Sequence, residues 1–229
     1  GRNHPNRKEE EMRFLREVEK VVERRGTVLI PSFAMGRSQD ILMILQDSDL
    51  DLEIHYDGMG KTITKTMLEH KNELLNPVAL EQAFGRVRKV SSKSDRKKAL
   101  EADVIVSTSG MLDGGPAVWY LNRLRMDNRN SVFLTGYQAE GTGGRMLLEK
   151  GRLPIFGKIT PIDLDVKRFD FSTHAGHDEL VNFAKECKAE DVILYHTDHK
   201  TSRPPLTKSL LELGINVHTP MNRETYIIE

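Results

Sequence analysis

The sequence predicts an α/β protein whose strands form a largely parallel sheet. Short apolar runs of the length of a buried strand recur along the 229 residues, amphipathic stretches of helical period lie between them, and glycine-rich turns follow several of the runs. Strands that alternate with helices favour parallel pairing, because each helix carries the chain back to the edge where the next strand begins. With 38% hydrophobic residues, the chain has enough apolar side chains to fill a core.

The first predicted element is a helix over residues 8–25, with Asn6 as its N-cap and Gly26 as its stop. Its apolar residues share one helical face: Phe14, Leu15, Val18, Val21 and Val22. Buried strands are expected at residues 27–31, 52–56, 86–90, 103–107 and 131–135. Helices are expected through residues 41–45, 58–75 and 118–124, and after the turn at 141–145.

The last part of the chain has the order strand, histidine, helix, strand, histidine. Apolar residues within 166–171 and 192–194 predict the strands, and residues 178–187 predict the helix. His174 and His196 follow the strands, so we expect both at the carboxyl ends of one parallel sheet, facing one crevice. A histidine there can bind a metal or transfer a proton; the alternative is that both are exposed strand-end residues without a function. A helix at 205–213 and a closing strand pair at 216–219 and 224–228 complete the prediction.

The composition excludes several classes of protein. The 34 basic and 34 acidic residues give a net charge of zero, so nucleic-acid binding would depend on a local patch. Cys187 is the only cysteine, which excludes an internal disulfide and a cysteine-based zinc cluster. No run is long enough to cross a bilayer and no signal peptide is recognisable, so we expect a cytoplasmic protein without a membrane partner. The basic segment at 86–98 is either a solvated face, which we favour, or an RNA track.

Two glycine loops each follow a predicted strand and open a predicted helix. They lie at residues 108–116 and 141–145, where backbone N–H groups and a helix dipole could hold an anion. Neither loop matches a Walker motif or a GxGxxG fingerprint, and no Gly-x-Ser-x-Gly elbow is present. A phosphate site and a structural turn are therefore equally open for both loops.

Several segments, in this order, resemble motifs of the β-CASP nucleases, a branch of the metallo-β-lactamase superfamily that processes RNA and, in some members, DNA. The most recognisable is Leu29-Ile-Pro-Ser-Phe-Ala-Met-Gly-Arg-Ser-Gln39; others lie at 3–14, 107–111 and 137–145. Asp170-Phe-Ser-Thr-His174 is similar to motif B of the family and Ile193-Leu-Tyr-His196 to motif C. A histidine at motif C is typical of RNA-cleaving members. The resemblance points to an archaeal or bacterial nuclease of the cleavage-and-polyadenylation type.

The resemblance implies two domains. Residues 1–165 would form the β-CASP domain, a parallel sheet with helices on both faces, and residues 166–229 the C-terminal strands and helices of a metallo-β-lactamase-like domain. The superfamily's His-x-His-x-Asp-His metal motif does not occur in this sequence. We therefore expect the C-terminal portion of a larger enzyme that carries two zinc ions, and we expect this chain alone neither to hold zinc tightly nor to cleave RNA.

The resemblance also implies roles at the motifs of the complete enzyme, in which zinc activates a water for attack on an RNA phosphodiester. His196 would be a zinc ligand, and His174 would stabilise the phosphate or protonate the leaving oxygen. Ser172 would hydrogen-bond the scissile phosphate. The family usually has Gly-Glu where this chain has Thr197-Asp198, and Asp198 would orient His196 or point to solvent.

The remaining expectations concern nearby residues. We expect His177 and His199 to be surface residues. RNA or phosphate binding is expected at Arg37, Ser109, Gly141, Thr142 and Gly143.

The expected function is metal-dependent hydrolysis of RNA in processing or decay, with RNA as the partner. One alternative is a non-catalytic RNA-binding or scaffolding subunit of a processing complex, against which the presence of both His174 and His196 argues. A nucleotide-binding α/β domain is the weaker alternative, because it rests on the glycine loops alone. By resemblance, a homodimer or a processing-complex partner is also expected, with residues 216–228 as a possible contact.

Overall fold

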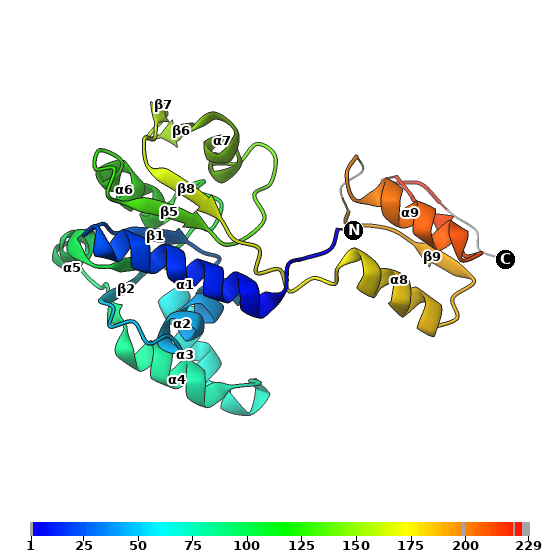
Figure 1. Cartoon of the computed structure of the whole chain (residues 1–229), viewed down its shortest axis with the longest axis horizontal. Coiled ribbons are helices and arrows are strands. Elements are labelled where there is room, and N and C mark those ends of the chain that lie inside the picture. The colour runs from blue at the N-terminus through cyan, green and yellow to red at the C-terminus, as the bar shows by residue number, and fades with distance from the viewer. Residues whose placement is uncertain (1, 198–199, 222, 226–229) are drawn as a thin grey trace. The chain divides into compact units, whose positions relative to one another are not determined.

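The chain forms two compact units. In a computed structural model, residues 2–197, 200–221 and 223–225 are described (Figure 1). The larger unit is Asn6–Phe171, and the smaller unit is Ser172–Glu229 together with Gly1–Pro5. Each unit has its own sheet and its own hydrophobic core.

A six-stranded parallel sheet forms the centre of the larger unit. Its strands are β1 (Val28–Pro31), β2 (Ile54–Asp57), β3 (Arg88–Lys89), β4 (Val104–Ser107), β5 (Ser131–Leu134) and β8 (Asp165–Arg168). They lie in the order β3-β2-β4-β1-β5-β8, and all neighbours are parallel. The four central strands are buried along their whole length, which explains the mainly apolar sequences of β1, β4 and β5; β2 also buries His55 and Asp57.

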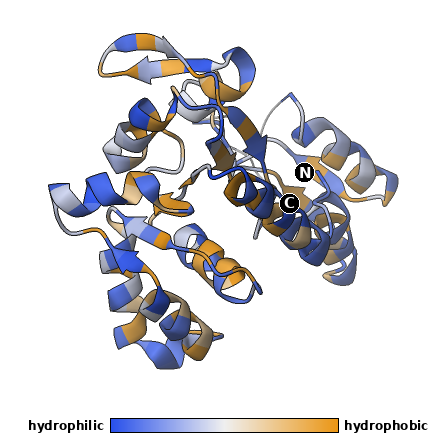
Figure 2. Ribbon diagram, turned by 60° about the vertical axis from the view of Figure 1, so that its left-hand side comes forward, coloured by the Kyte–Doolittle hydropathy of each residue, from blue (hydrophilic) through white to orange (hydrophobic). Residues whose placement is uncertain are grey.

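Helices cover both faces of this sheet, and alternate strand residues belong to two cores. Val28 and Ile30 pack with α1 (Arg7–Glu23), α2 (Arg37–Gln46) and α4 (Pro77–Arg86). Leu29 packs with α6 (Gly115–Leu124) and α7 (Gly143–Lys150) in the other core. This division follows from the two-residue period of a strand. In Figure 2, helices carry apolar residues (orange) and polar residues (blue) on different sides, as expected of amphipathic helices.

Shorter elements complete the larger unit. After β2 come α3 (Gly60–Glu69) and the 3₁₀ turn η1 (Lys71–Glu73); between β3 and β4 lie α5 (Lys93–Lys98) and η2 (Ala99–Glu101). After α7, an antiparallel hairpin is formed by β6 (Arg152–Ile155) and β7 (Lys158–Pro161).

The smaller unit has two helices, two strands and a small core among its described residues. Its elements are α8 (His177–Glu186), β9 (Asp191–Ile193), α9 (Arg203–Glu212) and β10 (Asn216–His218). β9 and β10 pair in parallel. The buried apolar residues of this unit are Ala184, Leu194, Leu206, Leu210 and Ile215.

The structure confirms the predicted α/β class and the parallel sheet with helices on both faces. The predicted strands at 27–31, 52–56, 103–107 and 131–135 are confirmed to within two residues. Asn6 is the N-cap of α1, where its side chain accepts hydrogen bonds from the Lys8 and Glu9 amides. In the described part of the chain, every helix is too short or too polar to span a bilayer.

The prediction that His174 and His196 follow two strands of one sheet is wrong. The strand before His174 is β8, which pairs with β5 and ends at Arg168, whereas the strand before His196 is β9, which pairs with β10. β10, the first half of the predicted closing strand pair, pairs with β9, and residues 226–228 of the second half lie outside the described residues. Order along the chain does not determine pairing, since a short strand can add to any open edge.

Along the sequence, the larger unit ends at Phe171, six residues beyond the predicted domain boundary at 165. The reason is that β8 pairs with β5, and Phe169 and Phe171 are buried in the core of the larger unit. The assignment of the two parts to a β-CASP domain and a metallo-β-lactamase-like domain stays a prediction at this level of detail.

A glycine at the amino edge of the sheet leads to a stability prediction. A Cβ at Gly26 would lie 1.9 Å from the carbonyl oxygen of Arg129, a backbone atom that cannot rotate away. We expect Gly26→Ala to lower the free energy of unfolding in urea by about 1–3 kcal/mol, as overpacking does. The control is Gly85→Ala within α4, where no atom lies within 4 Å; this variant should be stabilised by about 0.5–1 kcal/mol. Equal unfolding midpoints for the two variants would contradict the close approach.

Candidate functional site

The carboxyl edge of the six-stranded sheet is the expected ligand edge, and the topology marks one place on it. The helix after β1 packs on one face of the sheet, whereas the helices that follow β4 and β5, its two neighbours, pack on the other. The loop after β1 therefore runs to one face of the sheet, and the loops after β4 and β5 run to the other. This divergence is the arrangement of a topological switch point. A candidate site of the larger unit belongs there.

Phe33 occupies this switch point, between glycines of the two neighbouring loops. A Cβ at Gly110 would lie 2.8 Å from the Phe33 nitrogen, and a Cβ at Gly136 would lie 3.5 Å from the Phe33 ring. Phe33 is 41% exposed, and Tyr137, in the loop after β5, is 58% exposed. Accessible aromatic rings at a ligand edge can stack on nucleic-acid bases. Neither residue is among the site residues predicted from the sequence, although an aromatic side chain in a strand-end loop was the available signal.

The glycine loop that opens α7 has its amides already bonded within the protein. The Gly143 N–H donates to Asp113 Oδ1 at 2.7 Å, and the Gly144 N–H donates to the Met111 carbonyl oxygen at 2.7 Å. A phosphate at Gly143 would have to displace the Asp113 carboxylate. The geometry therefore favours the structural-turn alternative for this amide.

Thr142 and Ser109, two other predicted phosphate-binding residues of the glycine loops, also form hydrogen bonds within the protein. The Thr142 hydroxyl is the N-cap of α7, accepting from the Arg145 amide at 3.3 Å and donating to the Ala139 carbonyl oxygen at 2.7 Å. Gly141 has a φ of +83°, a conformation that favours glycine. Ser109 Oγ accepts a hydrogen bond from the Asp113 amide at 3.3 Å. Their binding roles stay predictions.

Arg37 contacts an acid and a backbone carbonyl rather than projecting as an open cation. Its guanidinium donates to Asp40 Oδ2 at 2.5 Å and also to the carbonyl oxygen of Phe171. Arg7 donates to the other Asp40 oxygen at 2.5 Å and reaches the same carbonyl at 3.4 Å. Burial lowers the pKa of Arg37 from its ordinary value, and the Asp40 carboxylate opposes this shift. The two arginines and Asp40 thus form a clamp on the residue that precedes Ser172.

Side chains of α1 hold the residues just before this clamp. Arg13 donates to the Arg168 carbonyl oxygen at 2.7 Å, and its guanidinium lies 4.1 Å from the centre of the Phe169 ring. Glu10 accepts the backbone N–H of Asp170 at 2.7 Å. Together with Arg7 these contacts form a ladder along one side of α1, which we call the α1 ladder. It attaches the start of the motif B segment to the larger unit.

In the smaller unit, Ser172 and His174 lie together. The Ser172 hydroxyl oxygen accepts the backbone N–H of His174 at 3.2 Å, and the His174 side chain is exposed. His196 is also exposed and has a positive φ of 54° in the turn after β9. His177 is half-buried, and its Nε2 lies 3.0 Å from Ser209 Oγ on α9. His177 is thus partly exposed, as predicted for a surface residue, and its ring also contacts α9.

Asp198 and His199 lie outside the described residues.

Two family models match the chain. The Beta-Casp domain matches residues 38–147, and the Zn-dependent metallo-hydrolase RNA specificity domain matches residues 160–220. The chain belongs to the β-CASP family. The first match contains the strands β2, β3, β4 and β5 and both glycine loops, and the second contains Ser172, His174 and His196.

Relatives of this β-CASP chain come from several archaea. "RNase aCSPSF2" of Saccharolobus solfataricus is 42% identical over 96% of this chain, and "Probable RNase MJ4" of Methanocaldococcus jannaschii is 37% identical over 95% of it. "Transcription termination factor FttA" of Pyrococcus abyssi is 31% identical over 96% of this chain. The chain spans 45%, 52% and 38%, respectively, of the length of these relatives.

The described residues of this β-CASP chain do not by themselves assemble a zinc site. Among the described residues there is no group of three or more histidine, cysteine, aspartate or glutamate side chains that could hold a metal. A catalytic zinc takes three protein ligands. His174 and His196 are thus too few, and the structure does not fit a complete metal centre within this part of the chain.

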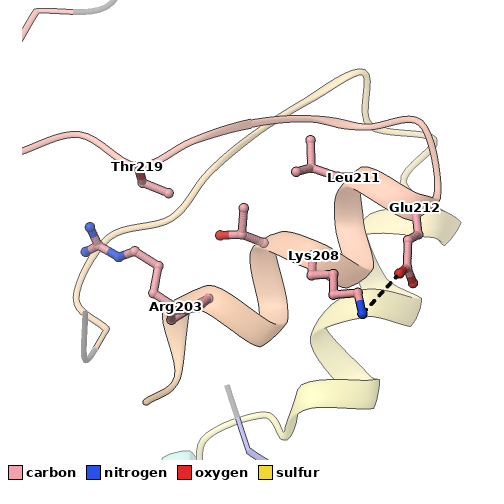
Figure 3. A pocket seen from close by; sticks show the side chains of 7 residues that line it. Arg203, Lys208, Leu211, Glu212 and Thr219 are labelled. Atoms are coloured by element: carbon pink, nitrogen blue, oxygen red, sulfur yellow. Dashed lines mark ion pairs between the residues drawn. The ribbon is translucent and has the colours of Figure 1, made fainter. Parts of the chain in front are cut away.

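A pocket of about 620 Å³ lies on α9 of the smaller unit, away from the predicted site residues in sequence (Figure 3). Arg203, Thr207 and Leu211 line it, and Lys208 lies 3.8 Å from Glu212 at its rim. Arg203 is 9% exposed. The described lining of this pocket contains none of the residues predicted for catalysis or RNA binding.

The clamp on Phe171 predicts a difference between two arginines. Arg37→Ala removes a buried charged hydrogen bond to Asp40 and to the Phe171 carbonyl, so the free energy of unfolding in urea should fall by about 1.5–3 kcal/mol. Arg145→Ala removes an exposed pair with Glu149, whose side chain is 48% exposed, and should change it by less than about 1 kcal/mol. Equal effects of the two substitutions would show that the clamp is energetically an ordinary surface pair.

The α1 ladder predicts a dependence of stability on pH. The pKa of Glu10 is lowered below its ordinary value, chiefly because Arg13 hydrogen-bonds the carboxylate, with the Asp170 N–H also favouring the charged form. A lowered pKa stabilises the fold above the unfolded-state value of 4.5 and loses this effect as the pH falls through the folded-state pKa. Urea unfolding from pH 6 to pH 3 should therefore show a shallower loss of stability for Glu10→Gln than for the unmodified chain. The control Glu149→Gln should keep the original slope.

Proposed function

We propose that the whole protein to which these residues belong is a ribonuclease that hydrolyses RNA phosphodiester bonds in RNA processing or decay. The supporting observation is the combination of a β-CASP match with histidines at both motif positions, His174 and His196, each exposed to solvent. Two relatives that align over 95% or more of this chain carry the word RNase in their names.

His174 is the residue that we assign to proton transfer or phosphate stabilisation. An exposed imidazole can reach a substrate, and histidine is the side chain suited to proton transfer near neutral pH. Ser172 positions it, because its hydroxyl oxygen accepts the His174 backbone N–H at 3.2 Å. We also assign to the Ser172 hydroxyl a hydrogen bond to the scissile phosphate. RNA contacts at Arg37, Ser109, Thr142 and Gly143 would require their present internal hydrogen bonds to rearrange, and a contact at Gly141 is part of the same proposal.

Zinc dependence is part of the proposal, with His196 as one ligand. The second family model is described as Zn-dependent, which supports zinc in the family. Since the described residues contain no group of three ligands, the other ligands would come from elsewhere in the whole protein. The chain studied alone should accordingly bind zinc weakly and leave RNA intact.

Substitution of single histidines in the whole protein tests the assignment. His174→Ala should slow RNA cleavage by about 10²–10⁴-fold, the usual contribution of a general acid or base, while zinc content stays unchanged. His196→Ala should lower the zinc content measured after dialysis. His70→Ala, at an exposed position after α3, is the matched control and should cleave RNA at the unmodified rate. Undiminished cleavage by His174→Ala would refute the role of His174, and stoichiometric zinc on the present chain alone would refute the missing-ligand argument.

A non-catalytic RNA-binding subunit is the second candidate function. It is favoured by the lack of a metal-binding group among the described residues and by relatives named as a transcription termination factor rather than as an RNase. Binding of RNA by the whole protein without any cleavage, in the presence of zinc, would support this candidate over the ribonuclease.

A further inference from the structure

The basic residues between β3 and β4 are concentrated on one short helix. Residues 86–98 hold seven lysines and arginines and a single acid, Asp95, in a chain whose net charge is zero. Arg86 and Arg88 face acids, at 3.6 Å from Asp51 and 3.2 Å from Glu53. The excess positive charge therefore remains on α5 itself.

α5 is too short to be stable by itself and is fixed at its start by a capping box. Isolated helices of six residues do not form in water. The Ser92 hydroxyl accepts the Asp95 amide at 3.0 Å, and the Asp95 carboxylate accepts the amides of Ser92 at 3.0 Å and Ser91 at 3.1 Å. The single acid of the segment is thus used chiefly to begin the helix, and Lys98 is the lysine of α5 that also interacts with it electrostatically.

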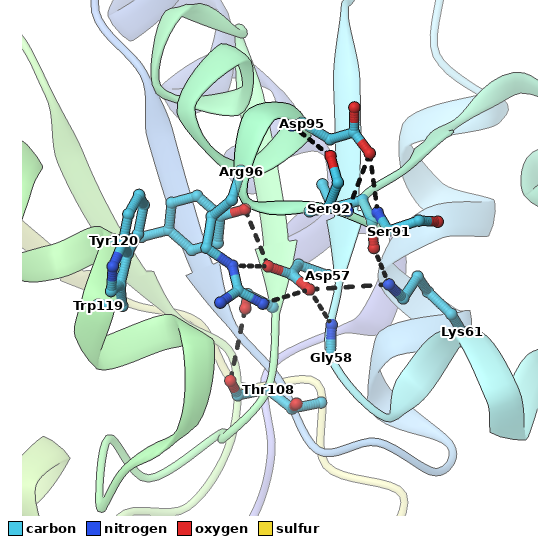
Figure 4. Close-up of polar contacts among 12 residues, drawn as sticks. Asp57, Gly58, Lys61, Ser91, Ser92, Asp95, Arg96, Thr108, Trp119 and Tyr120 are labelled. Atoms are coloured by element: carbon cyan, nitrogen blue, oxygen red, sulfur yellow. Dashed lines mark hydrogen bonds and ion pairs between the residues drawn. The ribbon is translucent and has the colours of Figure 1, made fainter.

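A buried carboxylate fixes the middle of α5 (Figure 4). Asp57, at the carboxyl end of β2, is 2% exposed and accepts hydrogen bonds from Arg96 Nε at 2.7 Å and Nη2 at 3.2 Å. It also accepts from the Tyr120 hydroxyl at 3.0 Å, and Lys61 Nζ lies 3.7 Å away. Burial raises the pKa of Tyr120, and Asp57 adds to the shift, so the hydroxyl keeps its proton and remains a donor. Arg96 is therefore the basic residue of α5 that points inward.

The lysines of α5 remain exposed to solvent. Lys93, Lys97 and Lys98 are exposed, and among the described residues neither Lys93 nor Lys97 takes part in an ion pair. Elsewhere basic residues lie beside acids on the same helix, as Arg7 does with Glu11 and Arg145 with Glu149. Lys93 stands in the first turn, where the helix dipole disfavours a cation, and four residues before Lys97, where like charges repel. Stability of the fold does not explain this arrangement.

An aromatic residue lies beside this helix. Trp119 on α6 is half-buried; its ring centre lies 3.6 Å from the Arg123 guanidinium and 5.7 Å from that of Arg96. Stacked indole and guanidinium groups next to exposed ammonium groups are the combination that single-stranded nucleic acids bind, through bases and phosphates respectively.

We propose that α5 and Trp119 form a surface that binds single-stranded RNA, with Lys93, Lys97 and Lys98 contacting backbone phosphates. The inference rests on the proposed function in taking RNA as the ligand. Its geometric basis is that the capping box and the Arg96–Asp57 pair fix the helix that carries the three lysines, so little backbone entropy is lost on binding.

The test is RNA binding by the full chain, measured by fluorescence anisotropy of a labelled single-stranded oligouridylate at several salt concentrations, with EDTA to prevent cleavage. The triple variant Lys93→Ala, Lys97→Ala, Lys98→Ala should bind at least about tenfold more weakly, and its slope of log K against log salt should be smaller by about 2, from 0.7 per lost phosphate contact. The control removes the same charge from exposed residues of α7 and the β6–β7 hairpin: Lys150→Ala, Arg152→Ala, Lys158→Ala. It should bind as the unmodified chain does.

Equal affinity and salt slope for the two triple variants would overturn the inference. So would unchanged RNA binding combined with loss of binding to phosphatidylserine vesicles, which would assign the surface to a membrane. Urea unfolding monitors the fold, and the alanine variant should be at least as stable as the unmodified chain because it removes repulsion. Loss of RNA binding in the α5 variant, if the whole protein never cleaves RNA, would keep this inference and reject the ribonuclease. Cleavage that depends on His174, with no binding defect in the α5 variant, would do the opposite.

Discussion

The α1 ladder is the constraint on which the larger unit and its exit segment depend. Arg7, Glu10 and Arg13 stand three residues apart, so they lie on one side of the helix and can contact consecutive groups of residues 168–171. Each contact provides a hydrogen-bond partner for a backbone carbonyl or amide at or beyond the end of β8, where no neighbouring strand supplies one. Such a group would cost about 1–3 kcal/mol if it were buried without a partner. Phe14, on the same helix, packs edge-on against Phe169 and Phe171, with ring centres 5.1 and 5.4 Å apart. Apolar and polar contacts therefore act on the same four residues.

Much of the larger unit could be predicted from the sequence, because its central strands are buried on both faces and three of them, β1, β4 and β5, appear as mainly apolar runs. The misses were elements without such a signal. α5 is almost entirely charged and exists because of a capping box and a pair with Asp57. In the β6–β7 hairpin, β6 alternates exposed and buried residues over only four positions, and β7 has no buried residue. α4 begins at Pro77 with Asn76 as its N-cap. This helix start signal is present in the sequence, but no helix is predicted there. Pairing of β8 with β5 could not be read from sequence order, and this led to the wrong placement of the two motif histidines in one sheet.

Residue types at the site were easier to predict than their contacts. Phosphate binding is predicted at Arg37, which lies within the most recognisable motif, yet its side chain is 12% exposed and bonded to Asp40. The acid three residues further along α2 was the available signal. Gly143 was assigned to an anion, and a carboxylate from another loop already fills that place. Nothing local to the glycine loop could have indicated Asp113, which lies 30 residues earlier. Ser172 and His174 follow from a short motif, and there the contact between neighbours is local.

The bond from Gly143 to Asp113 has a mechanical consequence. This hydrogen bond and the one from Gly144 to Met111 join the loop after β4 to the start of α7, at the end of the loop after β5. Both hydrogen bonds are 2.7 Å long. The two loops flank Phe33 through Gly110 and Gly136. A ligand that took the place of the Asp113 carboxylate would loosen both loops at once and change the width of the gap in which the Phe33 ring sits. Binding of an anion at the start of α7 would then be coupled to the orientation of the Phe33 ring.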